Sequence, residues 1–406
     1  MKTLCVIGSG TAGVISACRL LSDTKYNVHV IYDPTIPILG IGESTTAQIP
    51  MALYKAAKFS LWKDGDFLDA TVKYGVKYMG WRPYDIYSRF PTPNHGIHFN
   101  NFNLAEFTYK RLKEIHGDRF TIIHNGVNDI IEHIDSVDVV TTNGTNKYHV
   151  VVDCRGWPKT YEDYTTANIP VNGAIAHVKP TPNNFGYTGH TATKDGWMFT
   201  IPLTSRTGYG YLYNRDITSK EKAIENFAKV LKINTTSLAE DHRSFEWKNY
   251  YAKKFFTTRV IKNGNRALFY EPLEAMSGYF YDDLMTYAIN YINDKRGPRE
   301  QNKFTVSDIN SKLTLKAKYI EMFINYIYHG GSNYDTDFWK TTKKKCSDFL
   351  KDNEYFSDLT SVMKACDLHS RSDNQWYQTF TLQNWYDFDK QFGYHYWSDS
   401  RESKEW

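Results

Sequence analysis

Leu4-Cys-Val-Ile-Gly-Ser-Gly-Thr-Ala-Gly13 is the stretch that decides the fold of this chain. It begins with a short apolar run, typical of a buried strand, and apolar residues at helical spacing follow it. In between, Gly8, Gly10 and Gly13 have the G-x-G-x-x-G spacing of a turn that binds a dinucleotide. Such glycines permit a tight bend and a close approach to pyrophosphate, while the start of the helix offers free N–H groups.

The residues after this turn support the same interpretation. A second apolar strand is expected at residues 28–32, and an acid at its end could accept a hydrogen bond from a ribose hydroxyl. The pattern leaves NAD, NADP and FAD open, and its alternative is an ordinary turn between a strand and a helix. The predicted dinucleotide site includes Gly8, Gly10, Thr11, Ala12, Gly13 and Asp33.

Composition excludes several classes of protein. The 406 residues are 41% hydrophobic and 16% aromatic, enough for the core of a globular protein. A net charge of +4 is too small to indicate a nucleic-acid partner, and no apolar stretch is long enough to span a membrane. Gly8 interrupts the first apolar run, so no signal peptide is expected. Five widely spaced cysteines form neither a disulfide framework nor a zinc pattern, so we expect no metal and a cytoplasmic location.

Two segments before residue 100 carry polar side chains of interest. The first is expected to be a loop close to the ligand, the alternative being a surface turn; it contains Gly40, Ile41, Gly42, Glu43 and Ser44. The second, residues 71–81, is predicted to form one strand with Lys73 and Lys77 on one face, where lysines usually meet solvent. Residues 50–63 are predicted to be helical, and lone histidines such as His98 and His395 are predicted to be structural.

The middle of the chain is predicted to be rich in strands. Four short β-branched runs lie between residues 120 and 152, and Asn143-Gly144 between the last two predicts a hairpin. The chain then returns to the main sheet at residues 153–156, near the cofactor. Residues 160–260 are expected to be mostly β, with a helix near 221–231, and helices dominate from about 284 onward. Pro272 and Gly278 bracket a turn at the start of a helix, where N–H groups could face an anion.

Several stretches, in chain order, resemble the flavin-dependent halogenases of the tryptophan-halogenase type. The glycine turn looks like the FAD fingerprint of this family, and residues 36–43 resemble its I-P-x-x-G-V-G-E-A loop. Lys73 sits where the family keeps a catalytic lysine, and Glu274 ends an E-P-L-E motif at the position of its catalytic glutamate. Further stretches are similar to D-C-S-G, W-x-W-x-I-P and D-T-P-F-W, namely Asp153–Gly156, Gly196–Pro202 and Asp335–Trp339.

The resemblance implies a fold and a domain division. The fold is an α/β protein in which a Rossmann-like, three-layer FAD-binding domain of the glutathione-reductase type is interleaved with a smaller mixed β/helical substrate domain. The FAD-binding domain is expected at residues 1–50, 100–160 and 262–300. The substrate-binding portions are expected at residues 51–99, 161–261 and 301–406, all in one compact unit.

The resemblance also implies a reaction: FADH2, O2 and a halide give hypohalous acid, which halogenates an electron-rich aromatic ring such as an indole or a phenol. Lys73 would hold or activate this oxidant, and Glu274 would take the proton from the ring; a helix cap is the alternative for Glu274. Asp153 and Gly156 would contact FAD. Other implied positions are a halide site at Met276, Ser277 and Gly278, and residues near the flavin or tunnel at Trp197, Phe199 and Pro202.

The sequence departs from the family pattern at two motifs. Phe199 replaces the second tryptophan of W-x-W-x-I-P, and Ala275-Met276-Ser277-Gly278 replaces Ser-Thr-Gly after E-P-L-E.

No second G-x-G-x-x-G is present for NAD(P)H, so a separate flavin reductase is expected to supply FADH2 to this protein. The protein would act on a small aromatic substrate and could form oligomers. The alternatives are a flavin-dependent monooxygenase that hydroxylates an aromatic ring, and a noncatalytic flavin-binding protein.

Overall fold

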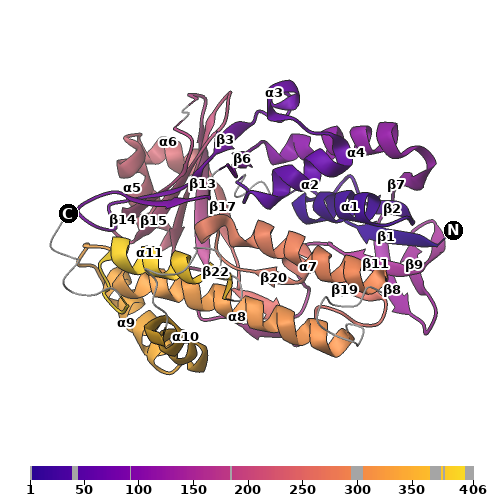
Figure 1. The fold of residues 1–406 in the computed structure, drawn as a ribbon. Coiled ribbons are helices and arrows are strands. Elements are labelled where there is room, and N and C mark those ends of the chain that lie inside the picture. The colour runs from indigo at the N-terminus through magenta and orange to yellow at the C-terminus, as the bar shows by residue number, and fades with distance from the viewer. Residues whose placement is uncertain are drawn as a thin grey trace.

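The computed structural model of the chain describes residues 2–38, 44–91, 93–182, 185–293, 305–365, 376–377 and 380–397. Figure 1 shows a five-stranded sheet on the N-terminal side and a seven-stranded sheet on the other, with the long helix α8 (Val306–Gly330) running along the lower side of both. One hydrophobic cluster of buried residues extends from the first helix to the C-terminal helices, so both sheets share a core.

The five-stranded sheet is parallel throughout and has the order β19-β11-β1-β2-β7. Alternate residues of β1 face opposite sides. Leu4 and Val6 pack with helix α1 (Thr11–Asp23), whereas Cys5 and Ile7 pack with the small sheet of β8, β9 and β10. Helix α1, the parallel sheet and the small sheet thus form three layers, which confirm the predicted Rossmann-like α/β fold. The strands are β1 (Thr3–Ile7), β2 (Asn27–Tyr32), β7 (Phe120–His124), β11 (Val150–Asp153) and β19 (Val260–Lys262).

The predicted hairpin at Asn143-Gly144 is confirmed, because it joins β9 (Val137–Thr141) to β10 (Gly144–Tyr148). Strand β8 (Val127–Glu132) completes this small sheet. The first of the four β-branched runs, β7, lies instead beside β2 in the parallel sheet. Helix α4 (Asn101–His116) precedes β7 and lies on the same side of the sheet as α1 (Figure 1).

The prediction of one strand over residues 71–81 is wrong. The chain forms β3 (Thr71–Lys73), which pairs with β6 (Gly96–His98), and then β4 (Gly75–Met79), which joins the seven-stranded sheet. Gly75, the first residue of β4, has a φ of +153°, and a Cβ there would lie 2.0 Å from the carbonyl oxygen of Ser88. Because the two lysines belong to different sheets, Lys73 is fully buried while Lys77 is partly exposed and pairs with Asp85.

The seven-stranded sheet has the order β17-β13-β16-β15-β14-β4-β5, and helices α5 (Lys220–Leu231) and α6 (Thr235–Glu240) flank it (Figure 1). The predicted β-rich region and its helix near 221–231 are thus confirmed, and α6 is a second, shorter helix that was not predicted. The remaining strands of this sheet are β5 (Ile86–Arg89), β13 (Gly173–Lys179), β14 (Thr188–Thr193), β15 (Gly196–Pro202), β16 (Thr207–Tyr213) and β17 (Arg243–Glu246). A further small sheet contains β12 (Tyr164–Thr166), β18 (Tyr250–Ala252) and β20 (Leu268–Phe269).

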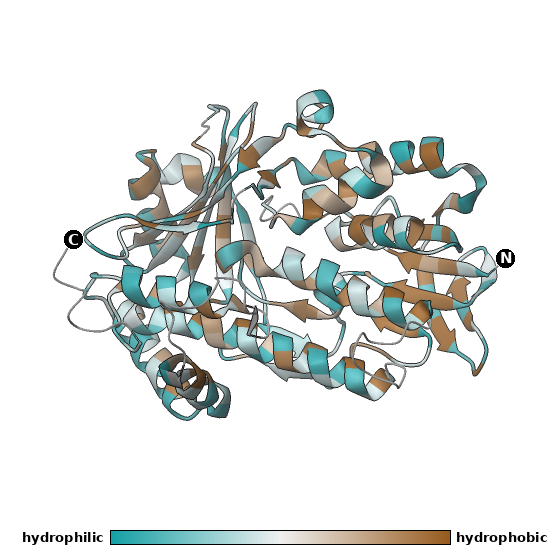
Figure 2. Cartoon of the chain, in the orientation of Figure 1, coloured by the Kyte–Doolittle hydropathy of each residue, from teal (hydrophilic) through white to brown (hydrophobic). Residues whose placement is uncertain are grey.

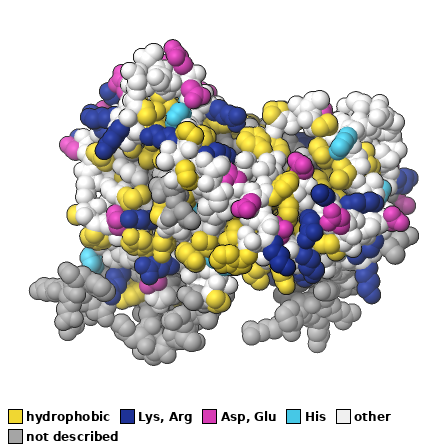
Figure 3. All heavy atoms as spheres, turned by 90° about the horizontal axis from the view of Figure 1, so that it is seen from above, with side chains coloured by type: hydrophobic (Ala, Val, Ile, Leu, Met, Phe, Trp, Pro, Cys, Tyr) yellow, Lys and Arg dark blue, Asp and Glu magenta, His cyan; other side chains and the backbone are white. Residues whose placement is uncertain are grey.

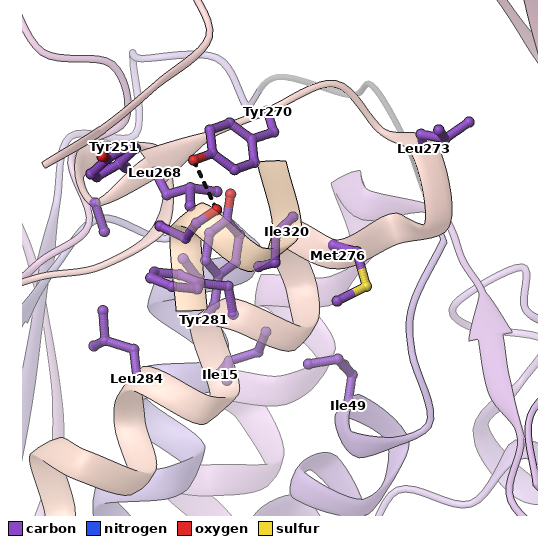
Figure 4. Close-up of a cluster of buried hydrophobic side chains, with 14 of the residues drawn as sticks. Ile15, Ile49, Tyr251, Leu268, Tyr270, Leu273, Met276, Tyr281, Leu284 and Ile320 are labelled. Carbon is purple, nitrogen blue, oxygen red and sulfur yellow. Dashed lines mark hydrogen bonds between the residues drawn. The ribbon is translucent and has the colours of Figure 1, made fainter. Parts of the chain in front are cut away.

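The helices between and after the sheets close the core. The single helix predicted at residues 50–63 is two, α2 (Gln48–Ala57) and α3 (Leu61–Asp64). Helix α7 (Met276–Ile292) packs on α1 and α2, and Figure 4 shows side chains from α1, α2, α7 and α8 meeting there. The C-terminal helices are α9 (Asp337–Lys351), α10 (Glu354–Ala365) and α11 (Leu382–Phe392).

The distribution of hydropathy follows these layers. The strands of the parallel sheet are hydrophobic, and the helices on the outside alternate hydrophilic and hydrophobic turns (Figure 2). On the face seen in Figure 3, Lys and Arg side chains lie among hydrophobic and acidic ones. Among the described helices, none combines the length and the apolar character needed to cross a membrane.

Candidate functional site

Lys73 lies at the end of β3 and is fully buried. Its Nζ donates a hydrogen bond to Ser44 Oγ at 2.9 Å and lies 5.3 Å from the centre of the Phe90 ring. Burial lowers the pKa of Lys73 from 10.5 to about 8, and the charge of Glu274 opposes this shift. An amine with such a pKa can serve as a nucleophile as well as a hydrogen-bond donor.

Glu274 lies in the turn before α7, and two hydroxyls hold its carboxylate. Tyr78 Oη donates to Oε1 at 2.6 Å, and Ser88 Oγ donates to Oε2 at 3.1 Å. Enclosure of the carboxylate raises its pKa, although the residue as a whole is only half-buried, and the bond from Tyr78 and the charge of Lys73 act in the opposite direction. No side chain caps the first turn of α7, so the alternative of a helix cap is not observed.

The structure thus brings the two predicted catalytic residues within electrostatic reach of each other. One comes from β3 and the other from the turn before α7. Burial moves both groups toward their neutral forms despite their mutual attraction. Lys73, with a pKa of about 8, can therefore exchange a proton with a bound reactant in mildly alkaline solution.

The backbone that presents Glu274 is strained. Glu274 has φ 62° and ψ 6°, and Ala275 has φ 54° and ψ 29°, so two successive residues with side chains adopt the left-handed conformation. Each such residue costs on the order of 1 kcal/mol. The predicted turn at the start of a helix is confirmed, since α7 begins at Met276, directly after it. Met276, Ser277 and Gly278 form its first turn, whose N–H groups have no side-chain cap.

The glycine turn fits a dinucleotide such as FAD. Gly8 has a φ of +108°, and a Cβ there would lie 2.6 Å from the Cys154 carbonyl oxygen; a Cβ on Gly13 would lie 2.0 Å from the Gly8 carbonyl oxygen. A Cβ on Gly10 would meet nothing within 4 Å, so this position faces open space at the N-terminus of α1. Gly8 and Gly13 are therefore needed by the turn itself, whereas Gly10 leaves room for a pyrophosphate.

The two predicted acidic contacts differ in their surroundings. Asp33 follows β2, and its Oδ1 accepts hydrogen bonds from the Thr35 N–H and hydroxyl at 2.9 and 2.6 Å. Asp153 is buried at the end of β11; burial alone would raise its pKa, but Arg155 and Arg266 bring it below its usual value. Gly156 has a φ of +83° with open space at its Cβ position. Contacts of these residues with FAD stay predictions.

The positions Gly40, Ile41, Gly42 and Glu43 lie outside the described residues, whereas Thr11 and Ala12 begin α1. Thr11 donates its hydroxyl hydrogen to Asn101 Oδ1 at 2.9 Å. The structure places Ser44 beside Lys73, so its hydroxyl has a protein partner besides any contact with a cofactor. Within the described ranges, no group of three or more His, Cys, Asp or Glu residues could hold a metal ion.

Trp197 and Phe199 lie on β15 and are both buried. Trp197 Nε1 contacts Tyr328 Oη at 2.6 Å and Glu271 Oε2 at 3.3 Å, and Tyr328 Oη donates to the same carboxyl oxygen at 2.7 Å. Burial raises the pKa of Glu271 to about 8. These contacts join β15 to α8, so Trp197 has a structural role in addition to any place near the flavin.

Phe199 packs closely against the backbone of a neighbouring strand. A Cβ at Gly210 on the neighbouring strand β16 would lie 2.1 Å from the Phe199 ring. Pro202 ends β15, and its carbonyl oxygen accepts a hydrogen bond from Thr71 Oγ1 at 2.7 Å. This bond ties β15 to β3, the strand that carries Lys73.

An open cavity of about 1050 Å³ lies between residues of α2, α3 and β3. Residues of α2, α3 and β3 line it, among them Tyr54, Trp62 and Val72, whereas neither Lys73 nor Glu274 does. The buried lysine and glutamate therefore do not line this cavity.

Several residues of the site were not found from the sequence. Tyr78 and Ser88 hold Glu274 across the β4–β5 pair, and Thr188 and His98 lie beyond Ser44 in a hydrogen-bonded chain. Each contact joins segments that are distant in sequence. Only Tyr78 carried a signal, because it belongs to the same run as Lys73.

Comparison with protein families gives a match over most of the chain. A family model described as tryptophan halogenase matches residues 3–118 and 92–391. The chain is 21% identical to tryptophan 6-halogenase ThaL of Streptomyces albogriseolus over 87% of this chain and 81% of that protein. It is 19% identical to tryptophan 7-halogenase RebH of Lentzea aerocolonigenes, over 84% and 78% of the two chains.

Comparison with solved structures shows the same fold. The tryptophan halogenase of Shewanella frigidimarina superposes with a TM-score of 0.79 at 17% identity, over 97% of this chain and 89% of that one. BrvH, a flavin-dependent halogenase of Brevundimonas sp., gives a TM-score of 0.77 at 16% identity, over 97% and 90%.

Proposed function

The chain belongs to the tryptophan halogenase family, and from this premise we propose that it is an FADH2-dependent halogenase. The reaction would use O2 and a halide ion to form hypohalous acid. The halogen would then be placed on an electron-rich aromatic ring, such as an indole or a phenol. The observation that carries the proposal is the buried Lys73, whose amine lies in the field of the Glu274 carboxylate.

FAD would be held by the glycine turn and the start of α1, with the pyrophosphate at the open position beside Gly10. Reduced FAD would supply the two electrons that activate O2 for oxidation of the halide. We expect a separate flavin reductase to provide FADH2. The uncapped first turn of α7, at Met276, Ser277 and Gly278, is the proposed halide site, since helix N-termini favour anions.

Lys73 would bind hypohalous acid through its Nζ and orient it toward the substrate. Because burial lowers its pKa to about 8, a substantial fraction of the amine is neutral in mildly alkaline solution and can take up the halogen itself. The enclosed position of this amine keeps water away from a reactive oxidant.

Glu274 would stabilise the positive charge that develops on the ring when the halogen adds, and would then accept the ring proton. Tyr78 and Ser88 keep its two oxygens in place for this step. The raised pKa of Glu274 strengthens it as a base once it is ionised.

The test is an assay with purified protein, a flavin reductase, FAD and O2, in which each halide is offered in turn with a panel of indoles and phenols. We expect a product whose mass changes with the halide supplied and which is absent without halide. A product that carries oxygen and forms equally well without halide would identify an aromatic hydroxylase instead. Tight FAD binding with no turnover of any aromatic would identify a noncatalytic flavoprotein.

A further inference from the structure

A continuous chain of hydrogen bonds leads from Lys73 into the protein. Lys73 Nζ donates to Ser44 Oγ, Ser44 Oγ lies 2.9 Å from Thr188 Oγ1, and Thr188 Oγ1 lies 2.9 Å from His98 Nε2. On the far side of the imidazole, His98 Nδ1 lies 3.0 Å from Thr71 Oγ1. Lys73, His98, Thr188 and Thr71 are all buried, and Ser44 is half-buried.

The direction of every bond in this chain follows from its far end. The Thr71 hydroxyl donates its only hydrogen to the Pro202 carbonyl oxygen, so it can only accept from His98. The Nδ1 of His98 therefore carries a hydrogen. Burial and the charge of Lys73 keep the pKa of His98 well below its usual value, so the ring is neutral and Nε2 presents a lone pair.

The near half of the chain then has one possible arrangement. Thr188 must donate its hydroxyl hydrogen to His98 Nε2, which leaves Thr188 to accept from Ser44. Ser44 in turn accepts from Lys73 Nζ. All three bonds thus point from the amine toward His98, which is the terminal acceptor of the chain.

The backbone fixes these groups in register. His98 pairs with Thr71 across the β3–β6 ladder, and Ser44 forms an antiparallel bridge with His98. Thr188 begins β14, which pairs in parallel with β4. Ser44 stands where the I-P-x-x-G-V-G-E-A pattern has Ala, so the link to Lys73 depends on a residue at which this chain departs from that pattern.

We propose that Ser44, Thr188 and His98 form a hydrogen-bonded relay that orients the Lys73 amine, with the neutral His98 ring as its terminal acceptor. The relay fixes the Ser44 hydroxyl so that a lone pair of its oxygen faces Lys73 Nζ. No proton moves to His98, because burial and the charge of Lys73 oppose an imidazolium there.

The relay supplies a fixed acceptor to a lysine that has no direct contact with solvent. The titratable groups whose charges act on Lys73 or respond to it are Glu274, His98 and His190. Glu274 and its partners Tyr78 and Ser88 lie outside the relay, and the pKa of His190 is itself lowered by burial and by Lys73. The use of the neutral amine in halogenation rests on the proposed function, whereas the relay itself does not.

The direction of the relay is tested by NMR of the full-length protein labelled with 15N-histidine, with His98→Gln used to assign the signals of His98. We expect a neutral ring with its hydrogen on Nδ1 in the wild-type protein. Thr71→Val should remove this tautomer preference, because Thr71 is the group that accepts from Nδ1, and Thr71→Ser should restore it. A hydrogen on Nε2 in the wild-type protein would overturn the proposal.

The link to the amine is tested by the pKa of Lys73, measured by NMR with 13C-lysine and assigned with Lys73→Met. Ser44→Ala removes the acceptor of the ammonium, so we expect the pKa of Lys73 to fall by about one unit, and Ser44→Thr should restore it. Thr45→Val is the matched control, because Thr45 is a buried neighbour whose hydroxyl bonds only the Ile97 backbone in the described structure. An unchanged pKa in Ser44→Ala would overturn the relay.

Turnover then reports on the orientation of the amine. Thr188→Val removes the partner that fixes the Ser44 hydroxyl, so we expect kcat to fall about tenfold with little change in KM, and Thr188→Ser to recover it. Equal kcat in all three proteins would overturn the orienting role of the relay. Absence of halogenation in the wild-type protein would contradict the proposed function without altering either NMR result, so the two failures are distinguishable.

Discussion

At the scale of single residues, the site depends on what burial does to two charges. Lys73 loses solvation entirely, and Glu274 is held by two hydroxyl donors in a strained turn. Their mutual attraction reduces the cost of burial for both but does not remove it. The burial that destabilises the charged forms lowers the pKa of Lys73 and raises that of Glu274.

Replacement of Lys73 should separate catalysis from cofactor binding. We expect Lys73→Met to lower halogenation by on the order of 10²–10⁴-fold while FAD still binds, because the amine is not part of the glycine turn. In the wild-type protein kcat should rise with pH through about 8, as the buried ammonium loses its proton. Full activity of Lys73→Met, measured by product mass, would contradict the catalytic assignment.

The two glutamates of the E-P-L-E motif form a matched pair for a second prediction. Glu274→Gln removes the base that would take the ring proton, and we expect a loss of activity on the order of 10²–10⁴-fold. Glu271→Gln should keep most activity, because burial already holds Glu271 protonated near pH 7 and an amide oxygen can accept the same bonds. Comparison of kcat for the two variants at pH 7 decides the matter; equal losses would show that the motif acts only through the fold.

At the scale of elements, the glycines of the turn have different structural roles. Gly13 is needed for the contact of α1 with the turn, since a Cβ there would lie 2.0 Å from the Gly8 carbonyl oxygen. Gly10 has free space around it. The absence of a side chain at Gly10 therefore matters for the binding of a cofactor and not for packing within the protein.

Alanine at these two glycines should give opposite results. We expect Gly10→Ala to fold with unchanged thermal stability but to bind FAD at least tenfold more weakly, because the methyl group occupies the space for the pyrophosphate. Gly13→Ala should be destabilised by about 3 kcal/mol or more, since a backbone clash must be relieved. Thermal unfolding without FAD and a flavin fluorescence titration measure the two effects. Unweakened FAD binding in Gly10→Ala would remove the pyrophosphate from this position.

The elements also show which features the sequence can predict. The strand, turn and helix at residues 3–23 and the hairpin at Asn143-Gly144 are specified by local spacing and turn chemistry, and both predictions are confirmed. The break at Gly75 is not local, because it depends on the close approach of the Ser88 carbonyl oxygen on another strand. For the same reason, the partners of Lys73 and Glu274 could not be predicted from the sequence: they lie on segments that come together only in the folded chain.

At the scale of the whole molecule, buried acids make stability depend on pH. Glu271 has a folded-state pKa of about 8 and an ordinary value of 4.5, so between these values the unfolded chain releases a proton that the folded protein retains. Its contribution is therefore complete below about pH 4.5 and is lost as pH rises through 8. Glu321, with a pKa raised by burial to about 7, acts in the same direction. Lys73 acts in the opposite direction, but only above pH 8.

We expect the wild-type protein to lose stability relative to Glu271→Gln as pH increases from 5 to 8, by up to about 1.4 kcal/mol per pH unit. The amide cannot ionise, so the variant lacks this slope. Chemical denaturation of both proteins at several pH values measures the difference. Parallel curves would mean that Glu271 is already ionised in the folded protein.

The break at Gly75 has a consequence for reagents that attack amines. It sends Lys77 to a partly exposed position and Lys73 to the interior, although only three residues separate them. At pH 8 about half of the Lys73 side chains are neutral and hence nucleophilic, yet an acylating or alkylating reagent in solution will mark Lys77 and leave Lys73 untouched until the chain opens. Labelling of Lys73 is thus a measure of local opening at this strand, with Lys77 as the internal reference.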